Sequence, residues 1–278
     1  MTIDKQKLFI LFKYTIYILL SFNIWVFYQE EALASQEIFA TGLDLDQIIQ
    51  AFSSTIDTAA WVVLIWLFEM ETAVIPDDKL KGSFKWWLMA VRLVCYGFIV
   101  YALAGYSAKL LMFLSIQPFE VTDVCSLIGQ QYSYVFDLDE YPPLTASICA
   151  EFANQSLYLL PNTQVIGTAQ AMQAATNLAW TDVINATAWV LVIIMLEVEI
   201  FLQLRNRLSK HNQPFFNCLK IGLYTTLLVC AAYWGMKGDF IDFWDAFLWL
   251  VAFVFIELNI FNWNQETMTD TTLDSATQ

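Results

Sequence analysis

Ionisable side chains recur at a fixed spacing within apolar segments of this chain. The first set comprises Asp57, Trp61, Glu69 and Glu71. Two further sets keep the same spacing, with amides in place of some acids: Asn185, Trp189, Glu197 and Glu199, then Asp245, Trp249, Glu257 and Asn259. Ionisable groups within lipid are expensive, and they often mark ion paths or proton relays. The repeated acids therefore predict a polar layer that passes cations or protons.

Each acidic segment follows another apolar segment that carries a base and, four residues later, a tyrosine. The three pairs are Lys13 and Tyr17, Arg92 and Tyr96, and Lys220 and Tyr224. These bases and the glutamates Glu69, Glu197 and Glu257 lie at similar distances from the same ends of their segments. We expect each base to pair with an acid of an adjoining helix and each tyrosine to donate a hydrogen bond to the same carboxylates.

Two interpretations of this acid–base layer remain open. In the first, the pairs only fix the packing and register of the helices, because buried ion pairs often serve specificity. In the second, the layer forms an ion path or a gate. The same choice applies to Trp61, Trp189 and Trp249, which we interpret as packing anchors, with a binding site as the alternative.

Several other chemistries are excluded or disfavoured by the residues present. The chain has one histidine, His211, so histidine pairs that ligate haem are excluded and a histidine-based zinc site is disfavoured. No glycine-rich phosphate loop or nucleophile elbow occurs. We therefore predict no enzymatic activity, no cofactor and no metal site.

The composition is that of an integral membrane protein. Of 278 residues, 58% are hydrophobic and only 14% are charged, which leaves too few charged side chains to cover a soluble protein of this size. Long apolar runs are sufficient to cross about 30 Å of hydrocarbon as helices. We predict six spans near 8–27, 56–75, 86–106, 183–203, 216–235 and 243–262.

The basic residues predict the orientation of these spans. Eleven of the thirteen Lys and Arg residues fall on one side of the six-span scheme, and only Lys109 and Lys237 lie toward the other. By the positive-inside rule, both termini are cytoplasmic, in what we take to be a bacterial inner membrane. The net charge of −14 is concentrated on the outer side, where it attracts cations. A nucleic-acid partner is disfavoured for so acidic a chain.

The loop between the third and fourth spans is long enough to form a separate outer unit. Residues 117–162 contain Cys125 and Cys149, which we expect to form a disulfide because the outer side is oxidising. Residues 43–55 and 163–182 are compatible with helical approaches to the next spans. The tail 264–278 is rich in Thr and Asp and is predicted to be disordered and cytoplasmic.

The sequence thus predicts an all-α membrane domain over 1–278, built from three repeated helical hairpins with an outer insertion. The match is closest between Ile56–Thr72 and Ile184–Ile200, where seven of seventeen positions are identical. The preferred function is a cation- or proton-conducting channel or transporter in the lipid bilayer, and a homo-oligomer is compatible with it. The alternative is a non-catalytic structural or accessory subunit of a larger membrane complex.

Overall fold

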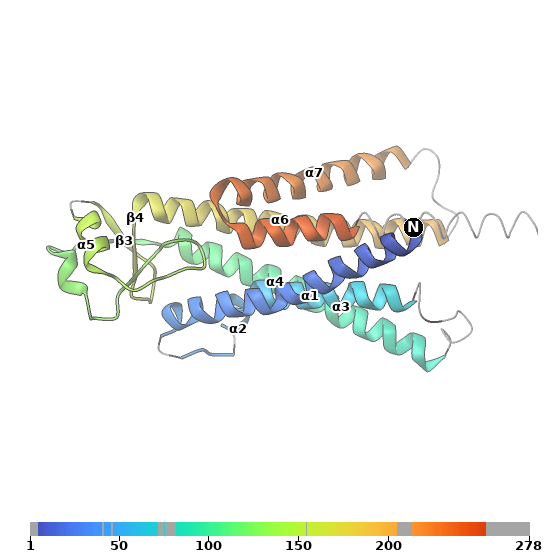
Figure 1. The fold of residues 1–278 in the computed structure, drawn as a ribbon, viewed down its shortest axis with the longest axis horizontal. Helices are drawn as coiled ribbons and strands as arrows, with labels where there is room; N and C mark the ends of the chain where they lie inside the picture. The colour runs from blue at the N-terminus through green and yellow to red at the C-terminus, as the bar shows by residue number, and fades with distance from the viewer. Residues whose placement is uncertain are drawn as a thin grey trace, which may run out of the picture.

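The computed structural model describes residues 5–40, 42–45, 47–71, 75, 82–153, 155–204 and 213–253, and most of these are helical. Long helices run side by side along the longest axis of the molecule, and a smaller unit with short strands lies at one end (Figure 1). We term this end the insertion end. The opposite end, where the first helix begins, is the terminal end.

Five labelled helices of 17 or more residues build the bundle. They are α1 (Lys5–Ile38), α3 (Ser53–Glu69), α4 (Ser83–Leu114), α6 (Ala169–Leu204) and α7 (Gln213–Lys237). Residues 240–253 form a further helical segment. One short helix, α2 (Ile48–Ala51), precedes α3.

Four helices are long and apolar enough to cross a membrane, within the residues that the structure describes. They cover Lys7–Ile38, Ser83–Leu114, Ala169–Glu199 and Pro214–Lys237. They contain the predicted spans 8–27, 86–106 and 216–235 and most of 183–203. Helix α3 has 17 residues, and the predicted span 56–75 continues into residues that are not described. The predicted span 243–262 is described only to residue 253, and the tail 264–278 lies outside the described residues.

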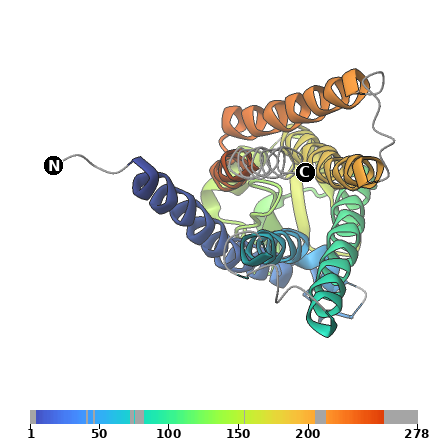
Figure 2. The same ribbon diagram turned by 90° about the vertical axis from the view of Figure 1, so that its right-hand side faces the viewer.

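The helices pack in an order that encloses a common axis. Helix α3 packs against α1 and α4, and α6 packs against α4 and α7. The segment 240–253 reaches α1 through Asn23, whose Nδ2 donates to Asp245 Oδ1 at 2.7 Å. The end-on view shows the helices arranged around the middle of the molecule (Figure 2). The largest buried apolar cluster draws side chains from all six segments, because the axis is where their apolar sides meet.

A tight turn joins α7 to the segment 240–253. Gly238 has a φ of 91°, a left-handed conformation that glycine adopts without a steric penalty. The backbone N–H groups of Gly238 and Asp239 both donate to the carbonyl of Trp234 at 3.1 Å, which ends α7. Asp239 then caps the next helix, since its Oδ1 accepts from the backbone N–H of Asp242 at 3.3 Å. This turn brings Trp234 and Asp242 to the same level of the bundle.

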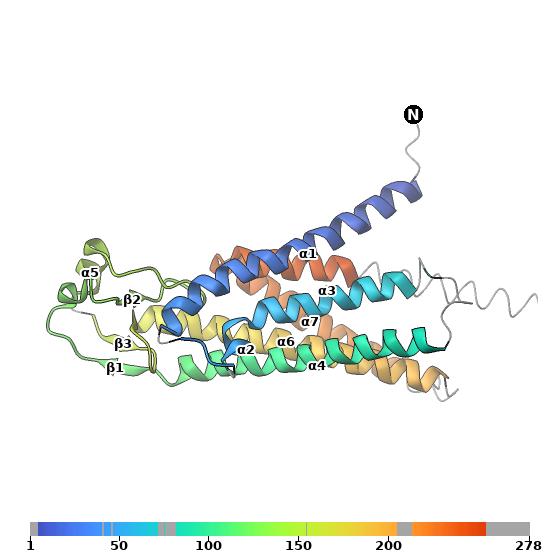
Figure 3. The ribbon, with the colours of Figure 1, turned by 90° about the horizontal axis from the view of Figure 1, so that it is seen from below.

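The fold is mostly helical, as predicted, but short strands occur in and next to the insertion, to which the sequence prediction assigned no secondary structure. The strands are β1 (Gln117–Phe119), β2 (Ser133–Tyr134), β3 (Leu157–Leu159) and β4 (Val165–Thr168), in the order β1-β3-β4-β2. Strand β3 is antiparallel to β1 and β4, and β2 is parallel to β4. Figure 3 shows this unit from below, beyond the ends of the bundle helices. A 3₁₀ turn, η2 (Val124–Leu127), and helix α5 (Ala146–Phe152) complete it.

The predicted disulfide is confirmed, and one helical expectation is wrong. Cys125 in η2 and Cys149 in α5 are joined, with their Cα atoms 5.1 Å apart. Residues 165–168 form β4 rather than the helical approach expected over 163–182, because Val165 and Ile166 are fully buried and their backbones pair with neighbouring strands. Helix α6 begins only at Ala169.

Candidate functional site

A small cavity lies near the bundle axis, between the middle of the bundle and the insertion end. Its volume is about 40 Å³, and its lining comes from α1, α3, α4, α6, α7 and the segment 240–253. We term it the central chamber. No basic side chain is among the described residues that line it, and its polar lining is Asp57, Thr58, Tyr106, Asp182, Asn185, Asp242 and Asp245.

Three tryptophans close the chamber on the side of the terminal end. The ring centroids of Trp61 and Trp189 are 5.5 Å apart, and those of Trp61 and Trp249 are 5.8 Å apart. Phe253 packs behind them, 4.6 Å from Trp189. Such edge-on and tilted arrangements suit the quadrupoles of aromatic rings. The indoles therefore form a packed floor, in agreement with their interpretation as packing anchors.

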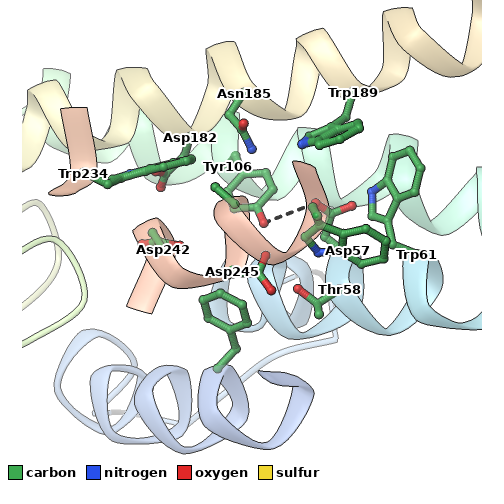
Figure 4. A pocket seen from close by; sticks show the side chains of 13 residues that line it. Asp57, Thr58, Trp61, Tyr106, Asp182, Asn185, Trp189, Trp234, Asp242 and Asp245 are labelled. Carbon is green, nitrogen blue, oxygen red and sulfur yellow. Dashed lines mark hydrogen bonds between the residues drawn. The ribbon is translucent and has the colours of Figure 1, made fainter. Parts of the chain in front are cut away.

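Each floor tryptophan follows a polar chamber residue by one helical turn. Asp57 precedes Trp61 on α3 and Asn185 precedes Trp189 on α6, while Asp245 precedes Trp249 on the segment 240–253. The carboxylate of Asp57 lies within hydrogen-bonding reach of the Trp61 side chain. The i, i+4 spacing places both members of a pair on one helix face, and Figure 4 shows those faces turned toward one another.

The chamber contains buried polar atoms without hydrogen-bond partners. These are Oδ1 of Asp182, Oδ1 of Asn185 and the indole Nε1 of Trp234. Asp182 is only 8% exposed and Trp234 only 3%. Asp57 is better satisfied, since the Tyr106 hydroxyl lies 3.5 Å from its Oδ2 (Figure 4). Buried polar groups are normally hydrogen-bonded to protein or to water, so these three atoms identify where water or a ligand fits.

Further acids surround the insertion end of the chamber. Glu31 of α1 is 1% exposed and accepts hydrogen bonds from the backbone N–H groups of Ser54 and Thr55 at 2.7 and 3.0 Å. It therefore caps the free N–H groups at the start of α3. Lys109 of α4, which is 5% exposed, pairs with Asp139 of the insertion at 2.7 Å.

The turn after α7, beside the chamber, carries Asp239, a carboxyl group with a raised pKa. Burial raises the pKa of Asp239, and the charges of Asp137 and Asp139 add to that increase, while hydrogen bonds with Asp242 oppose it. Burial likewise raises the pKa of Asp137 in the insertion. These two carboxyls thus hold protons more readily than free carboxyls do.

The acid–base layer lies on the other side of the tryptophan floor, and its bases are paired with acids of neighbouring helices. Nζ of Lys13 lies 2.6 Å from Oε1 of Glu69, which links α1 to α3. Arg92 lies 2.5 Å from Glu71, which links α4 to α3. Lys220 lies 2.7 Å from Glu199, which links α7 to α6.

The tyrosines differ in part from the prediction. The Tyr96 hydroxyl donates to Glu197 at 2.8 Å, as expected. Glu69, however, accepts from Tyr14 at 2.8 Å, and the hydroxyl of Tyr17 is buried without a hydrogen-bond partner. The rings of Tyr14 and Trp66 stack and orient Tyr14. Tyr224 packs against the main core. The predicted site residues Glu257 and Asn259 lie outside the described residues.

The structure separates the predicted residues into two sites. Asp57, Asn185 and Asp245, considered secondary in the sequence, line the chamber, whereas the described bases and glutamates form ion pairs and hydrogen bonds between helices. Four chamber residues were not among the predicted site residues: Asp182, Asp242, Tyr106 and Trp234. The two aspartates could have been found from the repeated spacing, because each lies three residues before the first polar residue of its set, at the position that Ser54 occupies in the first set.

The chain has no match among known family models, curated proteins or solved structures. The features that bear on its function are therefore the geometry of the chamber and of the ion pairs.

Proposed function

We propose that this chain is a membrane channel or transporter for cations or protons, and that the central chamber is part of its path. The observation that carries the proposal is a carboxylate-lined cavity near the axis of an apolar helix bundle, with no base among its described lining residues. Asp57, Asp182, Asp242 and Asp245 line one cavity. Buried acids without a basic partner are costly, so a cavity with four of them and no base among the described residues is better explained by a functional role than by packing.

The proposal includes the six-span scheme with three repeated hairpins. In this scheme α3 and the segment 240–253 belong to the two remaining spans, beside the four long apolar helices. Both termini are cytoplasmic, and the membrane is a bacterial inner membrane. It is supported by the convergence of Trp61, Trp189 and Trp249, one from each repeated set, at a single contact. The insertion then lies outside, where the disulfide is stable.

In this proposal the acid–base layer acts as an inner closure rather than as the path itself. Its bases Lys13, Arg92 and Lys220 are already compensated by carboxylates, so they do not repel a cation as free charges would. The tryptophan floor separates the chamber from this layer. Passage across the membrane then requires the floor to move.

The test is ion and proton flux in liposomes that contain the purified full-length chain. We expect flux above that of protein-free vesicles under an applied membrane potential, and we expect Asp57→Asn to reduce it. Glu151→Gln is the matched control, because Glu151 is an exposed acid on α5 that is remote from the chamber. Absence of flux of any cation or of protons, at either polarity, would contradict the proposal.

An accessory role in a larger complex is the second candidate, and the insertion is the feature that favours it. This unit has its own sheet, its own apolar cluster and a disulfide, and Phe136 on it is 64% exposed. Purification in a mild detergent tests this role. A stoichiometric partner that is lost with Phe136→Ser supports it, and a solitary chain that conducts ions excludes it.

A further inference from the structure

The size of the central chamber restricts what it can hold. A water molecule needs at least about 10–15 Å³ of such space, so a cavity of about 40 Å³ holds a few waters. A cation that keeps a shell of about six waters, as Mg²⁺ prefers, fits so small a cavity less well than separate water molecules do.

The chamber also lacks the arrangement that would replace a hydration shell. No group of three or more His, Cys, Asp or Glu side chains that could hold a metal ion occurs in the described part of the chain. The carboxyls are instead distributed along the path on different helices: Asp57 on α3, Asp182 on α6, and Asp242 and Asp245 on the segment 240–253. A series of separate carboxyls is suited to passing a proton from one group to the next rather than to holding one ion.

The buried polar atoms without partners provide an independent sign of bound water. Asp182 and Trp234 are both more than nine-tenths buried and line the chamber, and their side chains are close enough to interact, but neither Oδ1 of Asp182 nor Nε1 of Trp234 has a hydrogen-bond partner at normal geometry. Oδ1 of Asn185, on the same cavity, also has no hydrogen-bond partner. A buried water molecule requires two to four polar partners. Donor and acceptor atoms of this kind are available at the chamber wall.

We propose that the transported species is the proton, and that Asp242, Asp182 and Asp57 relay it through water molecules in the central chamber. This inference depends on the proposed function and specifies its substrate. In each step a carboxylic O–H bond breaks as an O–H bond forms on the adjacent water. That water releases one of its own protons to the next carboxylate. One positive charge moves per step, and no oxidant or reductant is required.

The charged groups around Asp182, Asp242 and Asp57 determine the net charge of the relay. Asp182 interacts electrostatically with Lys109 of α4, Asp139 of the insertion and Asp239 of the turn after α7. Asp242 interacts electrostatically with Asp239, Asp182 and Glu30 of α1. Around Asp57 lie Tyr106 of α4, Glu31 of α1 and Asp245. Acids outnumber the single lysine among these neighbours.

The experiment compares proton and metal-ion flux in the same liposomes, which contain the full-length chain. A pH-sensitive dye inside the vesicles reports protons, and dyes for Na⁺ and K⁺ report those ions. We expect proton flux alone. Asp182→Asn should reduce it by on the order of 100-fold, the scale expected for loss of a positioned proton-transfer group. Asp182→Glu should restore part of it, and Glu151→Gln should leave it unchanged.

The possible outcomes separate this inference from the proposed function. Na⁺ or K⁺ flux without proton flux overturns the proton relay and leaves a cation path in place. Absence of all flux overturns both. Proton flux that Asp182→Asn and Asp57→Asn leave unchanged overturns the assignment of these residues.

A second measurement covers the case in which the asparagine variants do not fold. Infrared spectra of the wild-type chain, exchanged from H₂O into D₂O, should show a carboxyl C=O band that shifts with the isotope. Such a band indicates a protonated carboxyl in contact with exchangeable water. Its absence in the folded wild-type protein overturns the relay.

Discussion

At the scale of single residues, the charged groups of this chain divide by whether a partner compensates them. Lys13 and Glu69 compensate each other deep in the bundle, with side chains only 8% and 2% exposed. Asp182, by contrast, forms no ion pair with a described residue: its Oδ1 has no hydrogen-bond partner, and Lys109 acts on it only through a longer electrostatic interaction. A paired charge contributes mainly to the uniqueness of packing, whereas in the proposed relay an acid without an ion-pair partner exchanges a proton. The two sites thus differ in chemistry although both consist of carboxylates.

Removing Lys13 tests the role of the buried pair. We expect Lys13→Met to lower the free energy of unfolding by about 3–5 kcal/mol, because it leaves Glu69 as an isolated buried charge. Denaturant unfolding in detergent measures this change. Lys220→Met is the matched control, since the side chains of Lys220 and Glu199 are 25% and 14% exposed, and its effect should be smaller.

The double variant Lys13→Met, Glu69→Leu provides an internal check. It removes both charges, so it should recover most of the stability that the single variant loses. Equal losses for Lys13→Met and Lys220→Met would contradict the argument from burial.

At the scale of elements, close approach of backbones determines how the chamber helices are spaced. Helix α4 carries Gly105 where α2 crosses it, and a Cβ atom at that position would lie 2.3 Å from the carbonyl oxygen of Ile49. Tyr106, the next residue, faces the chamber (Figure 4). The glycine therefore permits the contact that brings the Tyr106 hydroxyl to Asp57.

Gly105→Ala should disrupt that contact. We expect a loss of about 1–3 kcal/mol in the free energy of unfolding, the usual cost of overpacking, because the clash involves backbone atoms that cannot rotate away. Flux through the chamber should fall as well. Gly97→Ala is a matched control on the same helix, since a Cβ there meets nothing within 4 Å. A destabilisation by Gly97→Ala as large as that by Gly105→Ala would contradict this explanation.

At the scale of the whole molecule, the proposed six-span scheme predicts that the two ends of the bundle lie in different environments. The insertion lies at one end, and α1 and α7 begin at the other (Figure 1). Cys218, an exposed free cysteine near the start of α7, lies at the terminal end. Phe136 is exposed on the insertion. These two positions report opposite sides of the membrane in the proposed six-span scheme.

Labelling with a membrane-impermeant maleimide tests this scheme in intact cells that express the chain. We expect Phe136→Cys, made in a Cys218→Ser background, to react from outside. Wild-type Cys218 should react only after permeabilisation, and the buried Cys95 and Cys230 provide little background. Reaction of both positions in intact cells would contradict six spans, and reaction of Cys218 alone would reverse the orientation.

Local patterns in the sequence predicted a substantial part of this structure. Long apolar runs predicted four of the long helices, because a segment of this length that crosses lipid must satisfy its backbone polar groups by helical hydrogen bonds. The cysteine pair in the insertion predicted the disulfide. The repeated spacing of aspartate or asparagine and tryptophan placed these residues on one face of each helix. Such features depend on residues that are close in sequence.

The remaining features depend on how helices rotate and approach one another, which no local pattern specifies. Arg92 pairs with Glu71 rather than with Glu197, and Lys220 pairs with Glu199, because the direction of each helix face decides which acid is in reach. The strand β4 forms because partners exist in β2 and β3, which are distant in sequence or joined by loops. The sequence by itself therefore determined which segments are apolar helices and which residues share a face. Only the tertiary structure decided which carboxylates are paired and which line the chamber, because the free energy of a charge depends on what lies across from it.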